Sequence, residues 1–130
     1  MFANSNDIGK LILRLTLGVL VLLHGVAKIA SGPGAIIGMV EKAGLSGELG
    51  YLVYVGEVIA PILLIIGLWT RLAALLVAGN MLVAVVLVHT GDLFRLSSSG
   101  GWALELQAMF FFVAVAIALL GPGRYAVSRS

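Results

Sequence analysis

The sequence predicts an all-α membrane protein with four transmembrane helices in an up-down bundle and a short interfacial or re-entrant helix between the first and second spans. Hydrophobic residues make up 61% of the 130 residues, charged residues only 11%, and the mean hydropathy is +1.14. Soluble domains carry about 25% charged residues, so this composition excludes a water-soluble monomer. The chain also has four apolar runs of about 20 residues, and such a run crosses the ~30 Å hydrocarbon core at about 1.5 Å per residue.

The four predicted spans are separated by turn-forming residues and lie near residues 10–29, 51–69, 72–91 and 102–120. A Ser-Gly-Pro-Gly sequence at 31–34 ends the first run, and Trp-Thr-Arg at 69–71 forms a tight turn after the second. Gly-Pro-Gly at 121–123 stops the last helix. The spans fill a single domain, 1–130, and leave no room for a separate catalytic module.

The connection between the first two spans contains an apolar segment at residues 35–43. It combines four large apolar residues with Glu41 and Lys42. This composition favours a short helix that lies at the membrane interface or dips back into it. About nine residues are too few to span the bilayer.

Composition excludes several classes of function. Cysteine is absent, which excludes thiolate nucleophiles, disulfide relays and thiolate-bound metals. The formal net charge of +2 is too small for a nucleic-acid surface, and the histidines lack the spacing of a metal motif. We therefore expect neither a nucleic-acid partner nor a metal, and a redox function would require a bound cofactor or a protein partner.

Positively charged residues predict that both termini of this multi-pass protein face the cytoplasm. Lysine and arginine concentrate on the cytoplasmic side of membrane proteins, and here the count is five against three. The predicted cytoplasmic residues are Lys10, Arg14, Arg71, Arg124 and Arg129, and those on the other side are Lys28, Lys42 and Arg95. We interpret Lys10, Arg14, Arg71 and Arg124 as orientation signals in the inner membrane.

The candidate site begins with Glu57, an acid inside the apolar run 51–69. A charge at that depth is costly unless neighbouring helices neutralise it. His24 and Glu57 both lie about 9 Å inside the outer ends of their helices, and Lys28 follows His24 by four residues and shares its face. His89 and Glu105 form a shallower layer. These five residues predict a polar proton or ligand site in the outer third of the bundle, with no catalytic residue assigned.

Pro61 is predicted to kink the second span beside this site. A proline cannot donate a hydrogen bond to the carbonyl of Glu57 four residues earlier, and its ring pushes that carbonyl aside. A freed carbonyl in a bilayer is tolerated where it faces protein or a wet cavity. The proline therefore favours a Glu57 that points inward.

Each candidate also has a structural interpretation. Lys28 near a helix end is typical of a side chain that extends its ammonium group to the headgroups, and Glu57 can pair with Lys28 or His24 merely to fix helix register. Glu105 can act as an N-terminal acid stabilised by its helix dipole. Asn80 is more typical of a hydrogen bond between helices than of a ligand site.

Several short sequence features occur in a characteristic order along the chain. This order runs from His24-x-x-x-Lys28 through Glu57 and residues 67–74 (Gly-Leu-Trp-Thr-Arg-Leu-Ala-Ala), then His89, Gly100-Gly101-Trp102 with Glu105, and the tail 121–125. In this order, over about residues 10–128, the features resemble the DoxX family of small bacterial membrane proteins. The resemblance implies a four-helix inner-membrane protein. It also implies a redox role, because the family is named for membrane subunits linked to thiosulfate and quinone oxidoreduction.

The leading hypothesis is a membrane or quinone-facing subunit of a redox assembly, at most the membrane part of an oxidoreductase. A quinone needs an apolar slot with one or two polar groups, which His24 and Glu57 would supply. Lys28 would keep Glu57 charged, and His89 with Glu105 would carry protons to the periplasmic surface.

Two alternatives stay open at this point. One is a non-enzymatic scaffold or assembly factor, in which the polar residues hold helices together and the protein docks a redox or periplasmic partner. The other is a small proton-coupled transporter formed by an oligomer, with Glu57 as the coupling acid.

Overall fold

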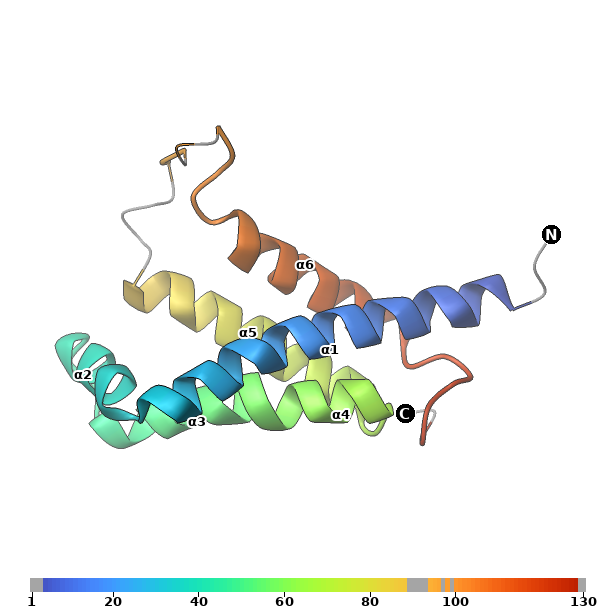
Figure 1. Cartoon of the computed structure of the whole chain (residues 1–130), viewed down its shortest axis with the longest axis horizontal. Helices are drawn as coiled ribbons and strands as arrows, with labels where there is room; N and C mark the ends of the chain where they lie inside the picture. Colours follow the sequence, from blue (N-terminus) through green and yellow to red (C-terminus); the bar gives the residue numbers. More distant parts are fainter. Residues whose placement is uncertain (1–3, 89–93, 97, 99, 129–130) are drawn as a thin grey trace.

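A computed structural model shows a helical chain (Figure 1) and describes residues 4–88, 94–96, 98 and 100–128. In this part of the chain there is no strand, only an isolated bridge between Leu96 and Trp102. The predicted all-α class is therefore confirmed. The elements are α1 (Ser5–Ser31), α2 (Gly34–Lys42), the 3-10 helix η1 (Gly47–Tyr51), α3 (Leu52–Tyr54), the π-helix η2 (Val55–Ile59), α4 (Ala60–Ile66), α5 (Thr70–Val88) and α6 (Glu105–Leu120).

Two helix pairs form the body of the protein. α1 packs along η2 and α4, and α5 packs along α6. The two pairs meet through α4 with α5 and through α1 with α6. The chain reverses direction from each long helical segment to the next, and α2 lies at the end where α1 finishes (Figure 1).

Length and hydropathy identify two segments that are able to cross a membrane. These are Ser5–Ser31 and the continuous helical run Gly47–Ile66. Two further apolar helices, Thr70–Val86 and Glu105–Leu120, are shorter. The short helix expected at 35–43 is present as α2, and its position relative to a membrane stays a prediction.

Two helix boundaries differ from those expected. The second segment ends at Ile66 rather than at 69, because Gly67 has φ 78° and Trp69 has φ 48°, and the chain turns there. α6 begins at Glu105 rather than at 102, because the backbone N–H of Ala103 donates to the Arg95 carbonyl at 2.9 Å. The expected end of the third span, near 91, lies outside the described residues.

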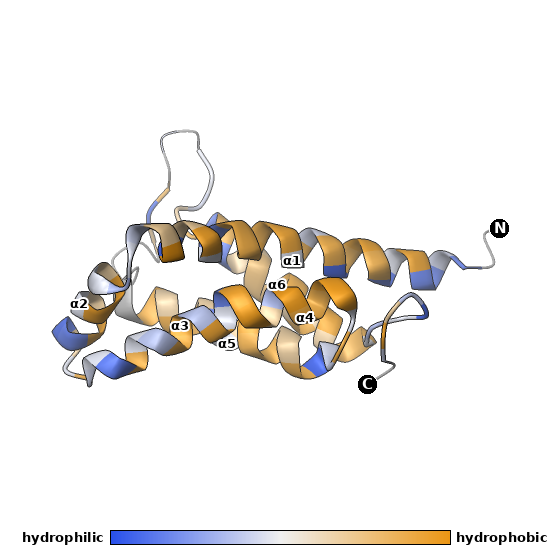
Figure 2. Ribbon diagram, turned by 60° about the horizontal axis from the view of Figure 1, so that its bottom comes forward, coloured by the Kyte–Doolittle hydropathy of each residue, from blue (hydrophilic) through white to orange (hydrophobic). Residues whose placement is uncertain are grey.

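Alanine supplies five of the twelve residues in the buried core cluster of the bundle. Ala60, Ala73, Ala74, Ala78 and Ala114 are buried in the core cluster, whereas many leucine, valine and phenylalanine side chains are exposed. Figure 2 shows hydrophobic residues on the outward-facing turns of the long helices. Small residues let helices approach closely, and outward apolar side chains suit contact with lipid. The distribution is that of a membrane protein.

Two glycines of α1 allow its close approach to the second segment. A Cβ atom on Gly18 would lie 3.0 Å from the carbonyl oxygen of Pro61, and one on Gly25 only 2.1 Å from that of Glu57. A methyl group cannot occupy either position without moving a helix. The small residues at 18 and 25 are therefore packing positions.

The distortion expected at Pro61 takes the form of a π-helical turn. Over Val55–Ile59 the helix widens, and the N–H of Ala60 donates to the carbonyl of Val55, five residues earlier. Because Pro61 lacks an N–H, it cannot complete the regular bond to Glu57. Turns of this kind interrupt α-helices frequently at functional sites. The turn sets Glu57 within the bundle, where it is buried.

At the opposite end of the bundle, Arg14 is fully buried rather than acting only as an orientation signal. Its guanidinium donates to the carbonyl of Leu64 at 3.1 Å and to the carbonyl of Tyr125 in the C-terminal tail. The tail itself is held by the N–H groups of Val127 and Ser128, which donate to residues 66 and 67 at 3.1 and 3.0 Å. Arg14 thus joins α1, α4 and the tail.

Candidate functional site

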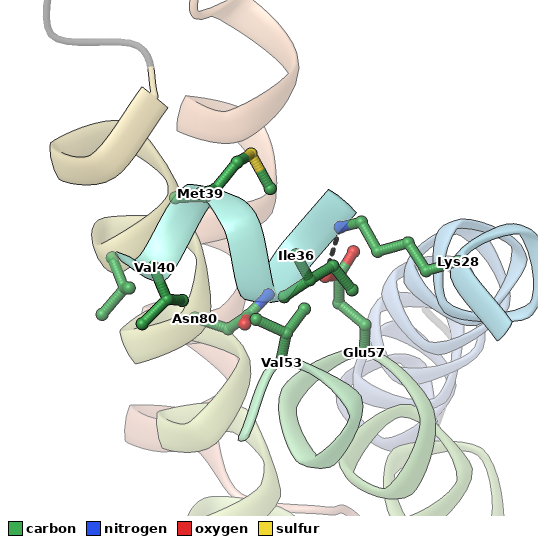
Figure 3. A pocket seen from close by; sticks show the side chains of 9 residues that line it. Lys28, Ile36, Met39, Val40, Val53, Glu57 and Asn80 are labelled. Carbon is green, nitrogen blue, oxygen red and sulfur yellow. Dashed lines mark hydrogen bonds and ion pairs between the residues drawn. The ribbon is translucent and has the colours of Figure 1, made fainter. Parts of the chain in front are cut away.

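Glu57 and Lys28 form an ion pair between the second segment and the end of α1 (Figure 3). Glu57 is 2% exposed, whereas the Lys28 side chain is 37% exposed. The carboxylate is therefore the buried member of the pair, and the lysine reaches it from the rim. The pairing predicted from sequence is present.

A hydrogen bond and a close backbone contact also hold the backbone around the Lys28–Glu57 ion pair. The hydroxyl of Tyr54 donates to the Lys28 carbonyl at 3.4 Å, which joins the last turn of α1 to α3. The Glu57 carbonyl that Pro61 cannot satisfy faces the backbone of Gly25. A glycine there lets the Cα–H approach the oxygen, a weak but favourable contact. The site is thus built on α1 and the π turn together.

One small cavity lies between Glu57 and α2. It has a volume of about 50 Å³, and Ile36, Met39 and Val40 of α2 cover it (Figure 3). Ile36 and Val40 are buried, so α2 uses its apolar face to close this side of the ion pair. Asn80 of α5 lines the same cavity and packs against Gly56, where a Cβ would lie 2.6 Å from the Asn80 Cβ.

A second cavity of about 110 Å³ lies on the other side of the ion pair. Its polar lining comes from Lys28, Glu57, Asn80, His24 and Gln107. His24 packs edge-on against the ring of Phe110, with ring centroids 5.7 Å apart and an interplanar angle of 77°. His24 and Leu106 are exposed, so the cavity reaches the surface between α1 and α6.

Gln107 lines this cavity and carries an unsatisfied polar atom. Its Oε1 atom is buried and has no hydrogen-bond partner among the residues that the structure describes. A buried acceptor without a partner is costly, and such groups often mark a place that a ligand or water completes. Sequence reasoning overlooked Gln107, although it is an amide early in an otherwise apolar helix.

The structure brings together three of the five predicted site residues. His24, Lys28 and Glu57 line the 110 Å³ cavity. Glu105 does not: it is exposed and lies with Trp102, Met109 and Phe112 on a separate depression that Leu13 of α1 also lines. His89 lies outside the described residues. Asn80, interpreted as a hydrogen bond between helices, lies instead at both cavities.

No carboxylate or histidine joins Glu57 and His24 to form a group of three within the described ranges, so these ranges offer no metal centre. The chemistry available is instead that of hydrogen bonding and proton transfer. The imidazole and the two amides each supply a donor and an acceptor, and the ion pair supplies charge. Such a set suits a neutral polar headgroup on an apolar molecule.

The chain is similar to a known protein family and to individual bacterial proteins. The sequence model of the DoxX family matches residues 9–90, which include Lys28, Glu57 and Asn80 but not Gln107. A Haemophilus influenzae protein, called "Uncharacterized protein", is 35% identical over 107 residues, or 79% of this chain and 78% of that protein. A Bacillus subtilis protein, called "Putative oxidoreductase CatD", is 31% identical over 84 residues, or 65% of this chain and 62% of that protein. No solved structure matches the chain.

Proposed function

The chain belongs to the DoxX family of membrane proteins, and on this premise we propose that it is a quinone-facing membrane subunit of a redox assembly. In this proposal α1, the η1–α4 run, α5 and α6 all cross the bacterial inner membrane, with both termini in the cytoplasm. The alternating directions of the four segments support that topology. The site around Glu57 then lies in the periplasmic third of the bundle.

The observation that carries the proposal is the cavity beside a buried ion pair, whose lining includes Gln107, a residue with an unsatisfied amide oxygen. A structural ion pair needs no cavity, and a packed bundle avoids leaving a buried amide oxygen unpaired. The cavity volume of about 110 Å³ is of the order of a single aromatic ring. Met81, Ala84, Leu106 and Phe110 give the cavity an apolar surface as well as its polar groups, and the headgroup of a lipid-soluble quinone has both kinds of surface.

The residues of the cavity fit such a headgroup. When bound, a quinone accepts two electrons and two protons at its carbonyl oxygens. The Gln107 amide has N–H groups to donate to a carbonyl and an oxygen to accept from a hydroxyl, so it suits the oxidised and the reduced forms. His24, at the edge of the cavity, is the residue able to hold and release a proton.

The Lys28–Glu57 pair has a different task in this proposal. Lys28 pairs with the buried carboxylate, and the pair fixes the distance between α1 and the π turn that forms the cavity wall. The apolar surface between α1 and α6 gives a lipid-soluble molecule a lateral entrance from the bilayer.

A redox assembly also needs a second component. The chain contains no cysteine, so electrons must come from a cofactor or a protein partner. The name of the Bacillus subtilis relative supports this class of chemistry.

Quinone retention tests the proposal directly. The purified full chain would be placed in lipid nanodiscs containing a defined quinone, and retained quinone would be measured by extraction. We expect Gln107→Leu to weaken retention about tenfold, since it removes a hydrogen bond of about 1.4 kcal/mol from a desolvated site. Glu57→Gln should also weaken retention, because it breaks the ion pair that fixes the cavity wall. Glu48→Gln changes an exposed acid of η1 and is the matched control, with retention unchanged. The proposal fails if the wild-type chain retains no quinone, or if all three variants retain it equally.

A second candidate is a scaffold that docks a membrane or periplasmic partner. It is favoured by the fact that the Lys28–Glu57 pair is complete without a ligand. Exposed Leu45, Leu49 and Met39 at the same end of the bundle would then form part of the contact. Crosslinking in native membranes distinguishes the two, because a scaffold must show a stoichiometric partner and the isolated chain would show no quinone affinity.

A further inference from the structure

A concave surface of basic character lies at the end of the bundle opposite Glu57. It has a volume of about 500 Å³ and is lined by the start of α1, the start of α5 and the tail after α6. We call this surface the basic bay. Its charged residues are Lys10, Arg71 and Arg124, together with the single acid Asp7. All three cations were interpreted from sequence as separate orientation signals, and the fold brings them together.

The Gly-Pro-Gly sequence after α6 gives the bay its shape. Gly121 has φ 84°, and a Cβ atom there would lie 2.9 Å from Nη2 of Arg71. Gly123 has φ 79°, and a Cβ atom there would lie 3.1 Å from the Cβ of Lys10. The missing side chains leave space for the basic residues of α1 and α5 to pack against the loop.

None of the three cations forms an ion pair with a residue that the structure describes, and only Arg124 makes a side-chain hydrogen bond there. Arg124 is held by its loop: its Nη1 donates to Oδ1 of Asn4 at 3.1 Å, and its backbone N–H donates to Oδ1 of Asp7 at 3.0 Å. Within residues 4–88 and the described parts beyond them, Lys10 and Arg71 make no ion pair or side-chain hydrogen bond. The bay therefore presents a net charge of +2 from three cations and one acid.

The surroundings of the bay indicate what kind of anion it holds. Leu120 lines the bay and is 47% exposed, and the neighbouring Leu119 and Leu72 are also exposed. An anion bound here thus meets guanidinium and ammonium groups at one end and bare apolar helix surface at the other. That combination matches a phospholipid, whose phosphate is joined to acyl chains, better than it matches a water-soluble phosphate.

We propose that the basic bay binds the phosphate headgroup of an anionic phospholipid, with Arg71 and Lys10 as the main phosphate contacts and the acyl chains along α5 and α6. Arginine suits this role because its planar group donates two parallel hydrogen bonds to a phosphate. Basic pockets at the cytoplasmic ends of membrane helices bind anionic headgroups in this way. The proposal is independent of the quinone site.

Native mass spectrometry of the full chain provides the test, with phosphatidylglycerol and zwitterionic phosphatidylcholine as probes. We expect phosphatidylglycerol to bind about tenfold more tightly, and Lys10→Gln/Arg71→Gln to remove that preference, since each basic contact with an anionic headgroup is worth about 1 kcal/mol. Lys42→Gln, which removes an exposed cation at the other end, should leave the preference intact. Arg71→Lys, which keeps the charge, should retain most of it and remains informative should the double variant fail to fold.

Competition identifies the source of the phosphate. Glycerophosphoglycerol carries the same phosphodiester headgroup without acyl chains, and we expect it not to displace phosphatidylglycerol. Full displacement would show that the bay serves a soluble phosphate compound and would overturn the lipid proposal. Equal binding of both lipids, or an unchanged preference in Lys10→Gln/Arg71→Gln and Arg71→Gln proteins that fold normally, would also overturn it.

Discussion

Arg14 and Glu57 are both charged side chains buried in apolar helices, but they are stabilised by different kinds of partner. Arg14, 0% exposed, is held by backbone carbonyls of α4 and the tail. Glu57 is held by a single flexible lysine that is itself partly exposed, and small cavities flank it on two sides. Because backbone carbonyls are fixed in place, the Arg14 guanidinium has a single bonded arrangement. The Glu57 carboxylate is paired with a flexible side chain and lies beside cavities, so several arrangements of the pair fit the space. The first is suited to structure and the second to ligand binding.

Replacing Arg14 tests the structural half of this comparison and should have the largest effect. Arg14→Met would leave the buried Leu64 carbonyl and the partly buried Tyr125 carbonyl without this donor. We expect a loss of about 3–5 kcal/mol of stability, because unsatisfied buried carbonyls cost about 1–3 kcal/mol each. Thermal unfolding in detergent measures the loss, and quinone retention per folded molecule should not change. A variant as stable as wild type would show that the tail contact is dispensable.

Replacing Gly25 tests whether the close approach of α1 to the second segment determines the packing at the site. Gly25→Ala places a methyl group where the Glu57 carbonyl lies, and overpacking of this kind costs about 1–3 kcal/mol. The matched control is Gly9→Ala in the same helix, where no atom lies within 4 Å of the added Cβ. We expect the control to be neutral or slightly stabilising, since alanine is the better helix former. Equal melting temperatures for the two variants would contradict the packing observed here.

The two partners of the ion pair should respond unequally when replaced. Lys28→Met leaves a buried carboxylate without a cation, and we expect a loss of about 2 kcal/mol, below the range for a fully buried pair because the lysine is partly exposed. Glu57→Gln should cost less, because the freed ammonium group can extend to the surface. Unfolding of both variants and of Lys28→Met/Glu57→Met would show the asymmetry. A larger loss for Glu57→Gln than for Lys28→Met would reverse the assignment of the buried partner.

Replacing Gln107 should change stability least, and it should distinguish most clearly between a ligand-binding role and a structural role. Gln107→Leu removes a buried acceptor that has no described partner, so we expect stability to be unchanged or raised by about 1 kcal/mol. Quinone retention should fall in the same protein. A destabilised variant would mean that the amide holds the helices together, as a purely structural polar group does.

Part of the site was readable from sequence and part was not. The depth of His24, Lys28 and Glu57 follows from their distance to the helix ends, because the rise per residue is constant. Rotation about the helix axis and the packing of neighbours do not follow from depth, so Glu105 was placed with the others although it lies elsewhere. For the same reason the sequence did not identify Gln107 as a site residue and gave Asn80 only a structural interpretation. An uncharged amide in a helix cannot be assigned to a site until its neighbours are known.

The sequence by itself determined the apolar helices, most of their ends, the short α2 and the need for a cation near Glu57. These depend on local chemistry: hydrophobic run length, the conformations that glycine and proline impose, and the cost of a charge in an apolar medium. Only the tertiary structure decided that Arg14 is bonded to the backbone of the tail, that cavities flank the ion pair, and that Lys10 and Arg71 meet at one bay. Those facts depend on contacts between residues up to 111 positions apart, and such contacts are set by helix packing, which no local pattern specifies.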